Sequence, residues 1–261
     1  MIKDEFTPLS VMRFMSEKRE IIIIDEADSS NNIAKELALN GAPEGTAIAV
    51  KKQTQGRGRM GRSFISLSEN GLYMSIILRP RISPDKCVDI TVIGAVAVAR
   101  AIERLCAKKC AIKWVNDIYI GEKKVCGILT EASIRDGLVD YAVIGIGVNI
   151  APPDGGFDEE ISHIACAMLE DTAPTDIKSR LLAEITDSFF EIYKELGTGS
   201  YMEEYRNRSN IIGKTVDVYR GDEIVSGVCV DIDKNANLVV KTDTGTRIFG
   251  SGDARVRKNE K

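Results

Sequence analysis

The stretch QTQGRGRMGR at residues 53–62 decides between two fold classes. From Gly56 to Gly61 it satisfies G-x-G-x-x-G, the pattern of a dinucleotide-binding turn between a strand and a helix. That interpretation requires a helix directly after the glycines and an acidic residue about 20 positions further on. Residues 62–67 alternate like a strand or a loop instead, and residues 76–79 contain no acid. We therefore do not expect a Rossmann domain.

The same stretch has the composition of an anion-binding loop. Its three glycines let the backbone approach a ligand closely, and Arg57, Arg59 and Arg62 supply guanidinium groups for phosphate or carboxylate. Residues 51–62 carry five cations and no acid, on a chain of net charge −4. Judged by charge alone, the stretch is equally compatible with a solvated surface loop. A basic loop on an acidic protein nevertheless indicates a small anionic ligand rather than a polymer. We expect a lid that orders when the anion binds.

Outside this loop, apolar periodicity predicts strands and helices in mixed order. Antiparallel-looking strands with helices between them indicate an α+β sheet domain. The expected strands are residues 21–24, 46–50, 71–78, 111–114, 118–120, 125–133 and 139–149, and the expected helices are residues 33–38, 84–106 and 177–196, with a short one after 201.

The pattern changes near Ile212. From Gly213 onward, short strands alternate with tight turns, and about 45 residues of this kind can form a small β-barrel. We therefore expect two domains, residues 1–212 and residues 213–261.

Six motifs follow one another between residues 28 and 149, within a resemblance that covers about residues 21–257: DSSN at 28–31, the loop at 56–62, GLYMS at 71–75, KWVND at 113–117, KVCGIL at 124–129 and GIGVN at 145–149. In order and spacing they resemble the motifs of biotin protein ligases, which are Asp-Ser-Thr-Asn, a glycine/arginine loop, Asn-Leu-Tyr-Leu-Ser, Lys-Trp-Pro-Asn-Asp, Lys-(apolar)-Ala-Gly-Ile-Leu and a Gly-x-Gly-x-Asn strand end. The resemblance implies a mixed-sheet biotin/lipoate ligase-like catalytic domain followed by a small SH3-like β-barrel.

The resemblance also implies a reaction. Biotin and ATP, with Mg²⁺, would give biotinyl-5'-AMP and pyrophosphate, and a lysine of a biotin carboxyl carrier protein would then take the biotinyl group. This order is chemically reasonable, because a free carboxylate is a poor acyl donor and a mixed anhydride with AMP is a good one. Both reacting groups are anionic, so cations must hold them together.

Three residues carry catalytic roles by this resemblance. Arg59 would hold the phosphate and Lys124 the carboxylate oxygen. Asp117 would hold the incoming lysine amine or assist its deprotonation. Without the motifs, Lys124 would be interpreted as a surface turn lysine, and Asp117 as part of an Asn-Asp turn.

Other residues would bind the substrates. Ser29, Ser30 and Gln53 can donate to and accept from the ureido ring of biotin, although helix capping and loop solvation would explain them equally well. Asn149 ends an apolar strand and would reach the adenylate. The remaining expected ligand-binding residues are Asn31, Gly56, Arg57, Gly58, Arg62, Phe64, Trp114, Asn116 and Gly127, and no protein ligand for a metal is assigned.

The chain departs from the family pattern at three positions. Val115 replaces the usual proline, which leaves that turn less constrained. Phe64 replaces a tryptophan near the adenine and offers a smaller stacking surface. Cys126 replaces a small residue, and related acyl transferases use a cysteine nucleophile, but an apolar strand pattern is typical of an inert thiol. His163 lies outside every motif, so we expect no histidine base.

Two rival functions stay open at this point. A lipoate or octanoate ligase of the same superfamily would use a different glycine-rich signature, and the arginine loop disfavours it. A non-catalytic biotin-binding protein would not need Lys124, Arg59 and Asp117 together.

The cellular setting follows from smaller signals. Six scattered cysteines without a C-x-x-C pair indicate reduced thiols in a cytoplasmic protein. The apolar run at residues 21–24 is too short for a membrane span, so we expect no membrane partner. About 20 residues precede the first expected strand, fewer than a helix-turn-helix unit needs. We therefore expect no DNA partner, and either a monomer or a homodimer.

Overall fold

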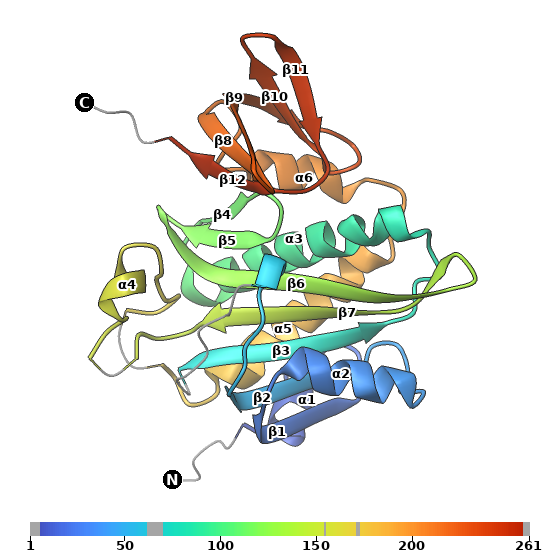
Figure 1. Cartoon of the computed structure of the whole chain (residues 1–261). Coiled ribbons are helices and arrows are strands. Elements are labelled where there is room, and N and C mark those ends of the chain that lie inside the picture. The colour runs from blue at the N-terminus through green and yellow to red at the C-terminus, as the bar shows by residue number, and fades with distance from the viewer. Residues whose placement is uncertain (1–5, 62–69, 154, 171–172, 258–261) are drawn as a thin grey trace.

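A seven-stranded mixed sheet organises the larger part of the protein (Figure 1). The computed structural model describes residues 6–61, 70–153, 155–170 and 173–257. The strand order is β1-β2-β3-β7-β6-β5-β4; β1 and β2 are parallel, and the other neighbours are antiparallel. The expected mixed-sheet α+β architecture is therefore confirmed. The strands are β1 (Ile21–Ala27), β2 (Ala47–Gln53), β3 (Gly71–Leu78), β4 (Cys110–Lys113), β5 (Asp117–Ile120), β6 (Lys123–Arg135) and β7 (Leu138–Asn149).

Helices cover both faces of this sheet (Figure 1). The long helix α3 (Cys87–Cys106) and α5 (Ile177–Tyr193) pack together against one face and enclose the main apolar core. Helix α2 (Ser30–Leu39) lies on the other face, where Ala34 and Ala38 meet Ile48 and Ile77. Two short helices, α4 (Glu159–Ser162) and α6 (Tyr201–Asn207), lie outside these layers. None of the described helices is long and apolar enough to cross a membrane.

Two short helices, α4 and the N-terminal α1, were not predicted from the sequence. Helix α1 (Pro8–Met12) begins with a capping box, in which Thr7 and Ser10 exchange side-chain and backbone hydrogen bonds, and has Pro8 in its first turn. Val11 is fully buried between α5 and β1. The capping signal was present in the sequence, but five helical residues are too few to show periodicity.

The basic loop connects β2 to β3, which are antiparallel neighbours in the sheet. A dinucleotide-binding turn instead joins a strand to the helix of a parallel crossover unit. The rejection of the Rossmann interpretation is therefore confirmed. The part of the loop that the structure describes ends in a single 3₁₀ turn, η1 (Arg59–Gly61).

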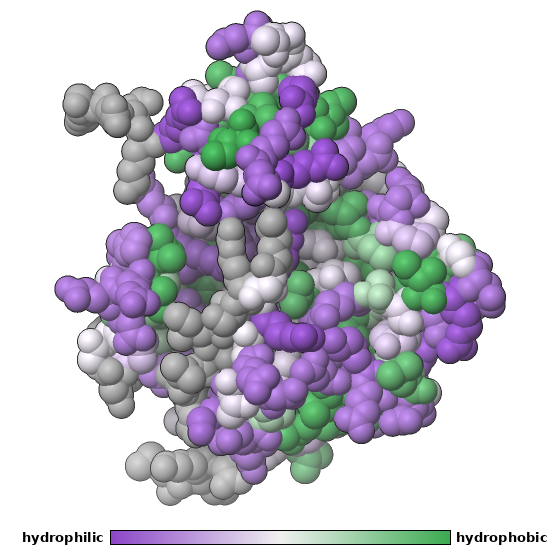
Figure 2. Space-filling view, viewed as in Figure 1, coloured by the Kyte–Doolittle hydropathy of each residue, from purple (hydrophilic) through white to green (hydrophobic). Residues whose placement is uncertain are grey.

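The C-terminal region forms a second, antiparallel sheet of order β11-β10-β9-β8-β12. On β8 and β10 the buried side chains, Val216 and Val218 and then Leu238 and Val240, alternate with more exposed residues. Figure 2 shows apolar surface on this sheet among hydrophilic residues. Between the described residues of β11 and β12 no ladder is formed, so the sheet does not close into the expected barrel. The strands are β8 (Thr215–Arg220), β9 (Glu223–Ile232), β10 (Leu238–Thr242), β11 (Gly245–Phe249) and β12 (Asp253–Val256).

Candidate active site

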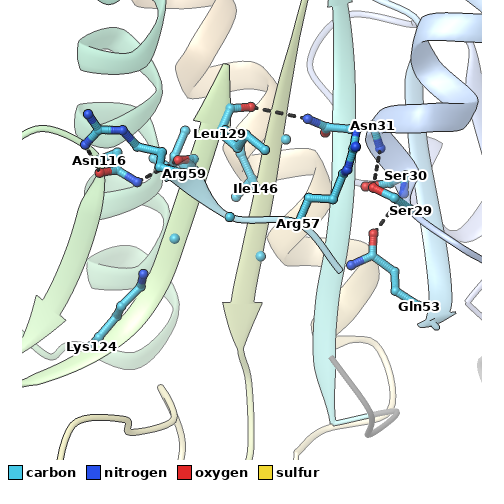
Figure 3. Close-up of a pocket in the computed structure, with 15 residues that line it drawn as sticks. Ser29, Ser30, Asn31, Gln53, Arg57, Arg59, Asn116, Lys124, Leu129 and Ile146 are labelled. Atoms are coloured by element: carbon cyan, nitrogen blue, oxygen red, sulfur yellow. Dashed lines mark hydrogen bonds between the residues drawn. The ribbon is translucent and has the colours of Figure 1, made fainter. Parts of the chain in front are cut away.

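A pocket lies beneath the basic loop, on the face of the sheet that carries α2 (Figure 3). Its floor is built from β6 and β7. Gly127 pairs with Gly147 and Leu129 with Gly145 across the two strands, so these four residues point to the same face. Three of the four have no side chain. The floor is therefore flat, and a ligand can lie directly on the strands.

The N-terminus of α2 forms one wall of the pocket. Ser29 is the N-cap, and its Oγ accepts from the backbone N–H of Asn31 at 3.3 Å. The backbone N–H of Ser30 donates to Gln53 Oε1 at 2.8 Å. All four side chains are almost completely buried. Buried polar groups of this kind need polar partners, so this wall suits a neutral ligand with both donors and acceptors.

Two further residues complete this wall, and the sequence did not assign them a role. Ser75, fully buried on β3, donates from Oγ to Asn31 Oδ1 at 2.7 Å and lies 2.8 Å from Ser30 Oγ. Glu131 on β6 accepts from Asn31 Nδ2 at 2.8 Å and from Lys35 Nζ at 3.0 Å. Ser75 belongs to a motif that the sequence did reveal, whereas Glu131 is 100 positions from Asn31 and had no signal.

The opposite end of the pocket is cationic (Figure 3). Lys124 Nζ forms an ion pair with Asp117 Oδ1 at 2.7 Å, and Arg59 Nη1 donates to Asn116 Oδ1 at 3.0 Å. Asn116 is itself fixed by donation to the carbonyl of Ile128 at 2.8 Å. The two cations thus lie at one end, each beside a group that can hold it until an anion arrives.

The backbone of Lys124 is hydrogen-bonded to the segment that follows α4. Its N–H donates to the carbonyl of Ile164 at 2.8 Å, and its carbonyl accepts from the N–H of Cys166 at 2.9 Å. The Cys166 carbonyl also accepts from Asn149 Nδ2 at 3.0 Å. The segment after α4 therefore fixes both Lys124 and Asn149, and this connection was not predicted.

The basic loop spans the pocket. Arg57 Nη1 donates to Asn32 Oδ1 at 3.2 Å on the α2 side, while Arg59 reaches Asn116 on the β5 side. Gly58 lies between them in the pocket lining. The cavity beneath measures about 60 Å³, and pockets for small molecules typically measure about 300–1,000 Å³. The cavity beneath the described part of the loop is therefore smaller than such a pocket.

The structure places the sequence-predicted residues as follows. Four predicted residues lie outside the pocket lining: Gly56 in the loop, Asp117 behind Lys124, Asn149 at the end of β7, and Trp114. Arg62 and Phe64 lie outside the described residues. The pocket is lined by Ser29, Ser30, Asn31, Gln53, Arg57, Gly58, Arg59, Asn116, Lys124 and Gly127 together with Ile128, Leu129, Gly145, Ile146 and Gly147, which were not predicted.

Cys126 is completely buried in β6. Burial raises the pKa of its thiol far above the ordinary value, although the nearby Lys124 acts in the opposite direction. Because the thiolate is the nucleophile, this cysteine is not poised to attack an acyl group. The structure thus agrees with the interpretation of Cys126 as an inert core residue. His163 is exposed at the end of α4.

Trp114 connects the two sheets of the protein. Its indole is buried, and Nε1 donates to the carbonyl of Ala236, in the turn between β9 and β10, at 2.7 Å. The Trp114–Val115 peptide bond is cis. Lys113 Nζ lies 3.8 Å from Asp253 Oδ1, beside the same interface. The motif at residues 113–117 therefore contacts the C-terminal sheet at one end and the pocket at Asn116.

We expect Trp114→Phe to destabilise the protein without weakening ligand binding in the pocket. Phenylalanine keeps the ring but leaves the buried Ala236 carbonyl without its donor, which costs about 1–3 kcal/mol. The measurement is the urea midpoint of unfolding, with titration of the pocket's ligand as the control. An unchanged midpoint together with a large loss of ligand affinity would place Trp114 in the binding site instead.

The chain matches two family descriptions. Residues 24–149 match the Biotin/lipoate A/B protein ligase family, and residues 211–257 match the Biotin protein ligase C terminal domain. The Bifunctional ligase/repressor BirA of Bacillus subtilis is 33% identical over 238 residues, covering 90% of this chain and 73% of that protein. The Biotin--[acetyl-CoA-carboxylase] ligase of Paracoccus denitrificans is 26% identical over 238 residues, covering 88% and 98%.

A solved structure has a similar fold over nearly the whole chain. It is the biotin protein ligase from Aquifex aeolicus in complex with biotin and ATP. The TM-score is 0.76 at 26% sequence identity, and the alignment covers 93% of this chain and 100% of that one. The likeness thus includes both the seven-stranded sheet and the C-terminal sheet.

Proposed function

This chain belongs to the biotin/lipoate A/B protein ligase family, and from that premise we propose that it acts as a biotin protein ligase at the pocket beneath the basic loop. It activates biotin with ATP to biotinyl-5'-AMP and transfers the biotinyl group to a carrier lysine. One observation carries the assignment of the site. A buried polar wall at Ser30 and Gln53 faces two cations, Arg59 and Lys124, across a floor of glycines.

The polar wall suits the ureido ring of biotin. That ring has a carbonyl oxygen that accepts and two N–H groups that donate, and Ser29, Ser30 and Gln53 offer matching groups. The flat floor at Gly127 and Gly147 leaves room for the fused rings to lie against the strands. The acyl chain then extends toward Lys124, at the opposite end of the pocket.

The cationic end suits activation of the carboxylate. A biotin carboxylate oxygen attacks the α-phosphorus of ATP, and pyrophosphate leaves with the electron pair of the broken P–O bond. Lys124 and Arg59 offset the repulsion between the two anions and stabilise the charge that develops on the phosphate. Lys124 can leave Asp117 for the incoming anion, because their contact is an exchangeable ion pair.

Transfer uses the same end of the pocket. The neutral amine of the carrier lysine attacks the biotinyl carbonyl, and AMP leaves. The amine gives up a proton as the amide forms, and we assign its acceptor as Asp117, which lies beside Lys124. Asn149, Gly56, Arg62 and Phe64 keep their proposed substrate-binding roles on the strength of the family motifs alone, whereas for Trp114, whose indole donates to the C-terminal sheet, we propose a structural role.

The Mg²⁺ ion is part of this proposal. Among the described residues, no three His, Cys, Asp or Glu side chains are grouped to hold a metal. Mg²⁺ often binds through substrate phosphates with few protein ligands, so this arrangement is compatible with an ion that arrives with ATP. The ion would supply additional neutralisation of the phosphates.

Several wider features also belong to the proposal. The carrier is a biotin carboxyl carrier protein or domain, by analogy with the named carboxylase ligases. The C-terminal sheet is an open form of the SH3-like fold, and the domain boundary lies between residues 212 and 213.

We propose a cytoplasmic monomer or homodimer. We also propose that no DNA partner exists: the net charge of −4 disfavours general DNA binding, and a gel shift with DNA would contradict this prediction.

Calorimetric titration tests the assignment against its nearest rival. The purified chain is titrated separately with biotin, lipoate and octanoate, each with and without a non-hydrolysable ATP analogue. We expect saturable binding of biotin and no heat from the two fatty acids at the same concentrations. Tight octanoate or lipoate binding without biotin binding would identify a lipoate-type ligase instead.

Arg59→Gly is expected still to form the adenylate, more slowly than the parent because Lys124 remains, but to release it early. One charge-assisted hydrogen bond contributes about 1.5–3 kcal/mol, or roughly 10- to 150-fold in retention. Released adenylate reacts with lysines of bystander proteins, because it is a reactive mixed anhydride in free solution. The measurement is biotin labelling of serum albumin by the variant with biotin and ATP. Unlabelled albumin, combined with parental adenylate dissociation, would show that Arg59 has no retention role.

A further inference from the structure

Glu131 lies just outside the pocket lining and contacts the polar wall through Asn31. Its Oε2 accepts from Asn31 Nδ2 at 2.8 Å, and its Oε1 accepts from Lys35 Nζ at 3.0 Å. Burial alone would raise its pKa, but the hydrogen bonds from Asn31 and Lys35 hold the pKa below its ordinary value. Glu131 is therefore ionised at neutral pH. An ionised carboxylate accepts hydrogen bonds and donates none.

This fixes which way the Asn31 amide faces. Its NH₂ group must point to Glu131, so its carbonyl oxygen points to the Ser75 hydroxyl, which donates to it at 2.7 Å. The amide oxygen also lies tightly against the floor, since a Cβ on Gly145 would come within 2.0 Å of it. The amide therefore has a single orientation that satisfies both neighbours.

The orientation affects Ser30, which lines the pocket. Ser75 Oγ lies 2.8 Å from Ser30 Oγ as well as 2.7 Å from Asn31 Oδ1, and one hydroxyl has only one proton for both acceptors. When the Ser75 hydroxyl donates its proton to the Asn31 oxygen, the lone pairs of Ser30 Oγ remain available to a ligand. A reversed amide would donate to Ser75, which would then direct its proton entirely at Ser30.

We propose that Glu131 is a positioning residue for the biotin end of the pocket: through Asn31 and Ser75, it keeps the Ser30 oxygen available to accept an N–H group of the ureido ring. This inference rests on the proposed function, because it takes the ligand at this wall to be biotin. It concerns binding alone, so it can be tested without ATP and without turnover.

The test is calorimetric titration of biotin into four proteins: the parent, Glu131→Ala, Glu131→Gln and Lys35→Ala. We expect Glu131→Ala to bind at least about tenfold more weakly, which corresponds to one lost hydrogen bond to a charged group. Glu131→Gln still offers an acceptor oxygen and should stay within about threefold of the parent. Lys35→Ala removes one ion pair of Glu131 but neither the Asn31 contact nor the ion pair with Arg57, whose Nη1 lies 3.7 Å from Glu131 Oε1. This variant should bind as the parent does, and Glu131→Gln, which loses both ion pairs, controls for the contact with Arg57. If the alanine variant does not fold, Glu131→Met provides the same comparison.

A double-mutant cycle tests the route through Ser75. If Glu131 acts through Asn31 and Ser75, Ser75→Ala should cancel most of the loss caused by Glu131→Ala, because it removes the hydroxyl proton that a reversed Asn31 amide would direct at Ser30. A double variant whose loss of biotin affinity equals the product of the two single losses would overturn the proposal. So would parental affinity in Glu131→Ala, or a Lys35→Ala variant as weak as Glu131→Ala. If the parent itself fails to bind biotin, the proposed function falls as well; if the parent binds and Glu131→Ala binds equally, only this inference falls.

Discussion

Lys124→Ala is expected to reduce biotin-dependent ATP–pyrophosphate exchange by about 10²–10³-fold, the usual effect of removing a group that stabilises charge in a transition state. Lys124 lines the pocket at the end opposite the polar wall, and its backbone is held on both sides by Ile164 and Cys166. Alanine keeps that backbone arrangement but removes the ammonium group. The carboxylate and the α-phosphate then approach each other without the cation between them.

The neighbouring lysine provides a matched control. Lys123 is exposed and donates from Nζ to the Ser162 carbonyl at 2.7 Å, away from the pocket lining. Lys123→Ala changes the net charge by the same amount and should retain the parental exchange rate within about threefold, as surface substitutions usually do. Equal rates in Lys124→Ala and the parent would exclude a role for Lys124 in activation.

Gly145→Ala is expected to weaken biotin binding by roughly 100-fold. The added methyl would lie 2.0 Å from Asn31 Oδ1. That oxygen accepts a hydrogen bond from Ser75, and the NH₂ group of the same amide donates to Glu131. Asn31 must therefore leave its position and lose both hydrogen bonds. Buried polar groups left without partners cost about 1–3 kcal/mol each, and every 1.4 kcal/mol is a factor of ten. The measurement is the dissociation constant of biotin by calorimetry.

The same substitution in an Asn31→Ala background separates this cause from general damage to β7. With the Asn31 side chain gone, the methyl has room, so Gly145→Ala should then change biotin affinity by less than about threefold. A 100-fold effect in both backgrounds would mean that the clash with Asn31 is not the cause. A thermal melt of each variant reports separately on the fold.

Local patterns in the sequence predicted most of the catalytic sheet. The expected strand at residues 71–78 matches β3 at both ends, and the helix that begins near Pro84 has the predicted apolar face. Strand and helix periods arise from neighbouring residues, so they can be recognised without tertiary information. Closure of the C-terminal sheet would require pairing between its two edge strands, β11 and β12, which no local pattern reveals, and the expected closed barrel was not found among the described residues.

The site was predictable where motifs mark it and not where contacts cross the fold. Lys124 and Ser30 were identified because they belong to recognisable segments. The glycine floor had a usable signal, since Gly145 and Gly147 alternate within an apolar strand and so leave one face without side chains. Glu131 had no such signal, because its role depends on a partner brought near by the sheet. Trp114 shares a motif with Asn116, yet its indole faces the C-terminal sheet.

The most direct test of the central claim is the intact mass of a biotin carboxyl carrier domain after incubation with this chain, biotin, ATP and Mg²⁺. Biotin activation at the pocket predicts that the carrier gains one biotinyl group on one lysine, with AMP and pyrophosphate formed in equal amounts. Omission of ATP, or use of Lys124→Ala, should leave the carrier mass unchanged. A carrier that stays unmodified with biotin but is modified with lipoate or octanoate would contradict the account.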